Sequence, residues 1–170
     1  MALIPNDIKK IDRDDGLLTF LDVTPTEATQ SWKVLGIGVT DYGIAYNPQI
    51  DSEKWIIEKN ARQIHSSNEK QGSVPQTAYK NDPVFEFVAA GRDKLNYRTH
   101  ILDIDMWNPT DASGTKTYPA KMSDGKVAIT QWMGEEAQIE YDLYYDGDAT
   151  EGTVTFDADM VPTFTPTVGL

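Results

Sequence analysis

The sequence predicts a mainly β protein with one α-helix covering part of the core. Several segments alternate apolar and polar residues with a period of two, which is typical of half-buried strands. One segment, residues 83–95, instead repeats its apolar residues at helical spacing. The chain has 170 residues, and a chain of this size buries roughly 70% of its unfolded surface. We therefore predict a single domain over residues 1–170 with a real core.

The strands are predicted from the alternation. Residues 138–146 show it best, and residues 152–157 repeat it after a turn at Gly147-Asp148, so we expect a hairpin or neighbouring strands there. A tight turn is predicted at Ser123-Asp124-Gly125. Further strands are expected within residues 17–23, 32–46, 54–59, 102–107 and 126–133.

The helix at about residues 83–95 has clear start signals. Asp82 can cap it and Pro83 suits its first position. A glycine at position 91 costs about 1 kcal/mol relative to alanine in a helix interior, so the second half is the less favourable one. The face predicted to pack against the core consists of Val84, Phe87, Val88 and Leu95.

Two stretches lack regular patterns. Residues 63–81 are mostly polar and are predicted to form a long loop, which is uncommon in a compact domain unless it is functional or disordered. Residues 161–170 are rich in Thr and Pro and are predicted to form an extended C-terminal arm. We expect both stretches to become ordered on a partner.

The charge distribution excludes several classes of partner. The chain carries 27 acids and 15 bases, a net charge of -12, and the last 44 residues hold nine of the acids and none of the bases. A sequence-reading nucleic-acid binder or a protein held on anionic lipid needs a basic face, so both are disfavoured, and we predict no membrane anchor. The absence of cysteine excludes disulfides and thiol chemistry. A solvated acidic face, or a surface that repels an anion, would account for the excess.

Catalytic signals are weak. His65 and His100 have no companions at ligand spacing, and we expect ordinary surface or strand-edge roles for them. Alternation on a strand places Asp103 with Asp105, and Glu140 with Asp142, in pairs that a hydrolase could use. Nothing else in the sequence supports a closed acid-base site. We therefore predict no catalytic residue, no cofactor and no metal site.

Five segments together resemble a known structural family. They are residues 47–56 (NPQIDSEKWI), 72–76 (GSVPQ), 79–87 (YKNDPVFEF), 139–143 (IEYDL) and 151–156 (EGTVTF). In this combination the chain resembles the major tail protein, or tail tube protein, of long-tailed siphophages of Gram-positive hosts. The likeness extends over residues 47–157.

This resemblance implies a β-sandwich or split barrel with one flanking helix. It further implies a virion protein, assembled in the host cytoplasm, whose six-fold rings stack into a hollow tail tube. Its partners would be other copies of itself, a tape-measure protein, a tail terminator and tail-tip proteins, while DNA passes without specific binding during genome ejection. An acidic lumen would suit such passage, because lysine or arginine facing it would hold phosphates. The acidic candidates for the lumen are Asp103, Asp105, Glu140 and Asp142.

The resemblance also assigns the polar loop a role. Extended segments would supply contacts between stacked rings, and the candidates are Gln71, Gly72, Ser73, Val74, Pro75 and Gln76. Two other hypotheses remain open from the sequence. One is a carbohydrate-binding or adhesive β-sandwich, which the four Trp and eight Tyr would serve. The other is a hydrolase built on the carboxylate pairs.

Overall fold

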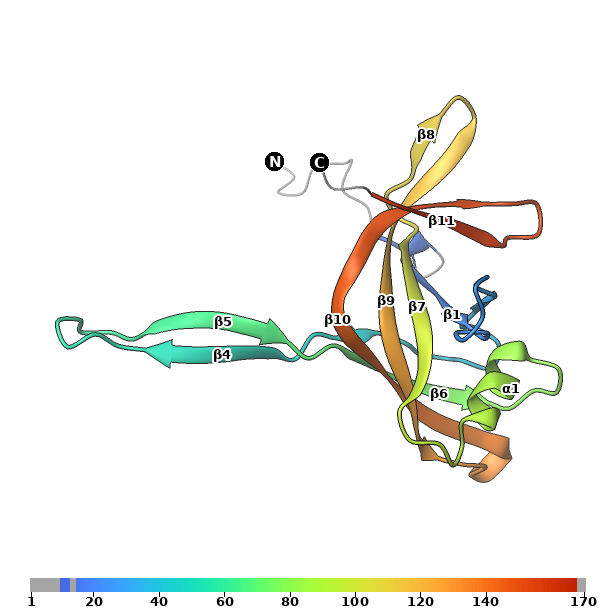
Figure 1. Ribbon diagram of the computed structural model, residues 1–170, viewed down its shortest axis with the longest axis horizontal. Helices are drawn as coiled ribbons and strands as arrows, with labels where there is room; N and C mark the ends of the chain where they lie inside the picture. Colours follow the sequence, from blue (N-terminus) through green and yellow to red (C-terminus); the bar gives the residue numbers. More distant parts are fainter. Residues whose placement is uncertain (1–9, 13–14, 168–170) are drawn as a thin grey trace, which may run out of the picture. The chain divides into compact units, whose positions relative to one another are not determined.

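The computed structural model describes residues 10–12 and 15–167 (Figure 1). Eleven strands, one α-helix and one short 3-10 helix (η2) are defined within these residues. In chain order they are β1 Leu17–Asp22, β2 Trp32–Val34, β3 Ile44–Ala45, β4 Pro48–Glu53, β5 Arg62–Asn68, β6 Gln71–Thr77, α1 Pro83–Ala90, β7 Tyr97–Asp105, β8 Thr110–Ala112, β9 Thr115–Gln131, η2 Glu135–Ala137, β10 Gln138–Phe156 and β11 Pro162–Pro166.

The strands form one large sheet and one small one. The large sheet has nine strands in the order β2-β1-β7-β9-β10-β6-β3, with β11 added to β10 and β8 added to β9. Strands β4 and β5 form a separate two-stranded antiparallel sheet. The predicted fold class, a mainly β sandwich-like protein with one α-helix, is confirmed. In the described part of the chain, no helix has both the length and the apolar character needed to cross a membrane.

The described residues form two compact units. The first comprises Met1–Leu35, His100–Asp124 and Gly147–Leu170 as far as these are described. Its core results from the predicted alternation: the apolar side chains of β1, β7 and β10 point inward and exclude water, which stabilises the unit. The buried members of this core are Phe20, Trp32, Leu102, Ile104, Ala120 and Val154.

The second unit comprises Gly36–Thr99 and Gly125–Asp146. Here β6 lies between β3 and the first half of β10, with Val74 paired to Tyr141. Helix α1 belongs to the same unit. The apolar side chains buried most completely are Val74, Val84, Val88, Ile139, Tyr141 and Leu143.

Helix α1 is shorter than predicted. Asp82 caps its start by accepting a hydrogen bond from Val84 N, and Val84, Phe87 and Val88 are buried. The helix ends at Ala90, because Gly91 serves as its C-cap and lies against the ring of Tyr97. Leu95 falls beyond the end and is 93% exposed. Its assignment to the packed face, and the extension of the helix to residue 95, are therefore wrong.

The predicted loop at residues 63–81 is mostly strand. Residues 62–68 form β5, and residues 71–77 form β6 in the interior of the large sheet. Neither strand shows the apolar alternation from which strands are predicted. β5 is exposed throughout and has no apolar face, and β6 buries the polar Gln76 as well as Val74. The pairing of β6 with β10 supplies the hydrogen bonds that a loop would have left to solvent.

Three other predicted features are corrected. The C-terminal arm at residues 161–170 is a strand over Pro162–Pro166, because Phe164 pairs with Val154 of β10; residues 168–170 lie outside the described residues. The turns predicted at residues 123–125 and 147–148 lie inside β9 and β10, which continue through them. Gly147 passes through with a φ of 65°, a conformation that glycine adopts without strain.

Candidate functional site

The β4–β5 hairpin continues the edge of the second unit beyond the large sheet. In β3 and β6, Ile44 pairs with Gly72 and Ala45 with Gln71. The same register resumes at Pro48 and Asn68 and runs outward, with one bulge after Gln49. One long hairpin therefore spans residues 44–72, with its inner part in the large sheet and its outer part, β4–β5, in a sheet of two strands (Figure 1). From Asn47 to Ile56 it extends about 30 Å at ~3.4 Å per residue.

The outer hairpin has no buried core of its own. Every residue of β4 and β5 is exposed. The hairpin is electrically neutral, with three acids and three bases between residues 48 and 68, whereas the last 44 residues of the chain hold nine acids and no base. Three of the bases of this acidic protein thus lie near the end of one hairpin: Lys54, Lys59 and Arg62.

The tip of the hairpin presents two isoleucines to solvent. Glu58 N donates to Trp55 O at 2.9 Å, which closes a β-turn with Ile56 and Ile57 at its central positions. Ile56 is 102% exposed and Ile57 is 85% exposed. Turn centres favour Gly, Pro, Asn, Asp and Ser, each for a conformational reason that isoleucine does not share. Two isoleucines at this position are therefore unfavourable for two reasons: their residue type does not suit a turn, and their apolar side chains are exposed to water.

Side chains around the turn hold it in one shape. The Glu58 carboxylate accepts a hydrogen bond from Trp55 N at 3.3 Å and pairs with the guanidinium of Arg62. The guanidinium of Arg62 in turn lies 4.1 Å from the centre of the Trp55 ring, a cation–π contact. Trp55 Nε1 donates to Glu53 at 3.3 Å. The tip is therefore an ordered apolar knob, which we define as Trp55, Ile56 and Ile57.

The residues predicted to contact neighbouring rings lie at the root of the hairpin instead. Gln71 to Gln76 form most of β6, paired on one side to β3 and on the other to β10. Gly72, Val74 and Gln76 are buried, and of the six only Ser73 is exposed. The exposed loop predicted here is wrong, because β6 is an interior strand. The exposed part of this hairpin is β4–β5, which precedes β6 in the chain.

A buried polar network fixes this root. Gln76 is 1% exposed, and its amide nitrogen donates to Asp82 at 2.7 Å and to Ile37 O at 2.9 Å. Its amide oxygen accepts from the Tyr141 hydroxyl at 2.9 Å. Burial raises the pKa of Tyr141 far above its usual value, and the nearby negative charge of Asp82 raises it further. The network ties β6, β10 and the start of α1 together.

The four acids predicted to face a lumen lie on two strands, one pair in each unit. Asp103 and Asp105 are on β7 and are half-buried, and Asp103 accepts a hydrogen bond from Thr19 Oγ1 at 2.6 Å. Glu140 and Asp142 are on β10 and are also half-buried. The Tyr144 hydroxyl donates to Asp142 at 3.3 Å. Partial burial raises the pKa of Tyr144, as do the negative charge and the hydrogen bond of Asp142.

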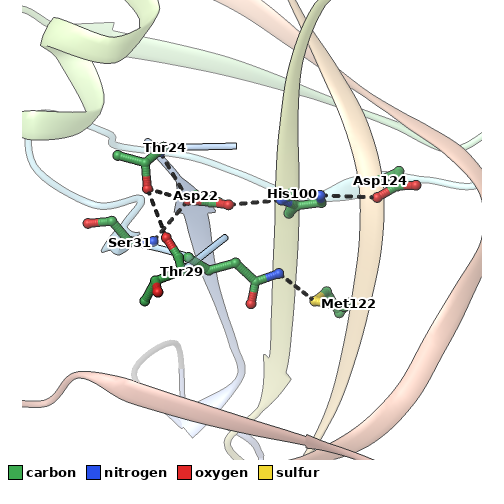
Figure 2. A network of polar contacts seen from close by, with 8 residues as sticks. Asp22, Thr24, Thr29, Ser31, His100, Met122 and Asp124 are labelled. Carbon is green, nitrogen blue, oxygen red and sulfur yellow. Dashed lines mark hydrogen bonds and ion pairs between the residues drawn. The ribbon is translucent and has the colours of Figure 1, made fainter. Parts of the chain in front are cut away.

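A second polar network surrounds Asp22 in the first unit (Figure 2). Asp22 is fully buried, and its Oδ1 accepts from Thr24 N at 3.0 Å and Ser31 N at 2.9 Å. His100 Nδ1 lies 2.8 Å from Asp22 Oδ2, and His100 Nε2 lies 3.4 Å from Asp124. Both nitrogens of His100 face carboxylates, so the arrangement holds the loop at residues 23–31 against β7.

The other histidine lies on the exposed hairpin. His65 is part of β5, where its Nε2 is 2.7 Å from Asn68 Oδ1. The two histidines are thus in different units, and His100 is on β7, three positions before Asp103.

Sequence reasoning missed the knob and the two polar networks. Residues 54–59 (KWIIEK) were predicted as a strand, because Trp and Ile are typical of strands. The flanking charges were the one available signal that the segment is exposed. The partners in the networks lie far apart in the sequence, 65 positions for Tyr141 and Gln76 and 78 for His100 and Asp22. Comparisons of the chain with protein-family models and with curated proteins find no match.

Proposed function

We propose that this chain is a self-assembling structural protein of the tail-tube type, whose copies associate into stacked six-fold rings around a channel. The observation that carries the proposal is the outer hairpin, which is exposed along its whole length and ends in the apolar knob. The six-fold symmetry, the tube and its place in a phage tail come from the resemblance of residues 47–157 to major tail proteins.

The hairpin requires a partner on energetic grounds. An isolated two-stranded hairpin is marginally stable at best, because it buries too little apolar surface to offset the entropy of ordering its backbone. Here the outer strands bury none of their residues within the chain. Contact with another molecule would bury the strands and the knob and would supply the missing stabilisation.

A second copy of the chain is the partner that its charge favours. The knob is flanked by exposed Lys54 and Lys59, whereas the body of the protein carries a large acidic excess. Because the hairpin as a whole is neutral, it avoids the repulsion between two acidic bodies, and its two exposed lysines can face carboxylates of the next copy. A contact between a hairpin and a different surface of the next copy is heterologous, and repeated heterologous contacts close into rings or extend into filaments.

The acidic excess also suits the channel that the proposal includes. Asp103, Asp105, Glu140 and Asp142 are half-buried on β7 and β10 and retain exposed surface. Carboxylates on a channel wall would repel phosphates and let DNA pass without counterion release or binding. Tape-measure, terminator and tail-tip proteins complete the proposed set of partners.

Negative-stain electron microscopy of concentrated, purified protein tests the proposal. We expect uniform hollow tubes or six-fold rings whose number rises with protein concentration. The control is the same protein at a concentration where sedimentation shows a monomer. A protein that stays monomeric at millimolar concentration, with and without preformed tail-tip complexes as initiators, would contradict the proposal.

A further inference from the structure

We propose that the apolar knob of one copy inserts into a hollow on the first unit of a second copy. This inference rests on the proposed self-assembly and identifies the surface that receives the hairpin. The hollow has a volume of about 430 Å³ and lies beside the β8–β9 turn and the end of β10. Its lining residues are Gly114, Thr115, Lys116, Tyr118, Phe156 and Met160.

The hollow has an ordered apolar base. The rings of Tyr118 and Phe156 meet edge to face with their centres 5.7 Å apart, and Phe156 also contacts Phe20 of the core, at 6.1 Å. Met160 is 55% exposed and offers a flexible apolar wall. Gly114 contributes only backbone to the lining, and no atom lies within 4 Å of where a side chain on it would begin.

The knob is comparable with this hollow in size, and Tyr118, Phe156 and Met160 offer it apolar surface. Sites that enclose small ligands typically measure about 300–1,000 Å³, and a volume of about 430 Å³ lies in the lower part of that range. Two isoleucine side chains held at the corner of a β-turn form a compact apolar group, comparable in size to such a small ligand. Within the turn, the contacts of Glu58 with Trp55 N and Arg62 hold the two isoleucines next to each other, so that they can enter the hollow together.

Charges around the two surfaces are complementary. Exposed Asp157 and Asp159 lie in the turn that leads to Met160, and hydrogen bonds from Asp159 N and Val161 N to Asp157 fix that turn. They would face the lysines that flank the knob, Lys54 and Lys59. Lys116 lines the hollow itself, and the exposed Glu53 near the tip carries the opposite charge.

Disulfide trapping between two different variants tests the contact, because the chain has no cysteine of its own. Ile57→Cys protein is mixed with Thr115→Cys protein under mild oxidation, and the cross-linked peptides are quantified by mass spectrometry. Since each protein carries one cysteine, every mixed disulfide is intermolecular. The matched control replaces the second protein with Leu95→Cys, an exposed position on the other unit.

We expect the 57–115 disulfide to form in roughly tenfold higher yield than the 57–95 disulfide, since a disulfide requires Cα atoms within about 7 Å. Sedimentation of the same samples separates this inference from the proposed function. Assembly with equal yields would overturn the hollow while leaving self-assembly standing, and absence of both assembly and cross-links would overturn both. Selective cross-linking in particles that are neither rings nor tubes would support the contact and contradict the tube.

Discussion

Replacing the two isoleucines of the knob should separate folding from assembly. In the variant Ile56→Ser with Ile57→Asn, the turn receives residues that its central positions favour. Neither isoleucine has a positive φ, so serine and asparagine can occupy the same backbone without strain. Both positions are almost fully exposed in the free chain, and such surface changes alter stability by no more than about 0.5 kcal/mol.

The effect on assembly should be large. Burial of an isoleucine side chain contributes about 1.5–3 kcal/mol. Loss of both anchors should therefore weaken each contact by about 3–6 kcal/mol, which is a factor of roughly 10²–10⁴ in the association constant. The magnitude depends on the exposures of 102% and 85%, because only side chains that are exposed in the free chain can gain this burial on association.

Sedimentation velocity over a range of protein concentrations, with urea unfolding of the same samples, measures both quantities. The matched control is Leu95→Ser, which removes a leucine that is 93% exposed but lies outside the hairpin. We expect the control to assemble like the wild type. Equal assembly of the knob variant would refute the role of the knob, and a loss of more than 2 kcal/mol in its unfolding free energy would show that the knob packs within the monomer.

Three further variants test side-chain packing and polar networks within the two units. Tyr141→Phe should lower the unfolding free energy at pH 7 by about 1–3 kcal/mol, because Gln76 loses its donor. Above pH 10 the difference in unfolding free energy between wild type and variant should narrow. Tyr141 ionises near pH 10.0 in the unfolded wild type but stays protonated in the folded one, because burial raises its pKa, so wild-type stability falls. A difference that stays constant with pH would contradict the raised pKa. Gly91→Ala should destabilise by about 1–3 kcal/mol despite its better helix propensity, because the new methyl would lie 2.1 Å from the ring of Tyr97; a rise in melting temperature would refute this. Asp22→Ala should cost about 3–5 kcal/mol in urea unfolding, and a cost under 1 kcal/mol would show that the network in Figure 2 contributes little.

Local patterns in the sequence were sufficient to predict the features that depend on a single strand or on one end of a helix. The alternation around Ile139 and Leu102 predicted buried faces that the structure contains, and Asp82 with Pro83 predicted the start of α1. These features depend on neighbours within a few positions, which is the range over which periodicity and capping act.

The remaining features depend on contacts between distant segments. The sequence of β6 is typical of a polar loop. Gln76 can be buried in a strand only because the hydroxyl of Tyr141, 65 positions away, donates a hydrogen bond to its amide oxygen. Gly147 reads as the end of a strand, although β10 continues through it to pair with β11. In the hairpin, Trp55 and Ile56 read as strand residues, because Trp and Ile are typical of strands. Only the turn closed by Glu58 N and Trp55 O shows that they form an exposed tip.

Amide hydrogen exchange at low and high protein concentration tests the central claim most directly. In the dilute monomer, the amides of residues 48–68 should exchange fast, because the hairpin is exposed on both faces. On assembly, these amides should become protected together with residues 114–118, while residues 92–96 remain unchanged. Protection that leaves residues 48–68 exchanging at the monomer rate would contradict the claim that this hairpin joins one copy to the next.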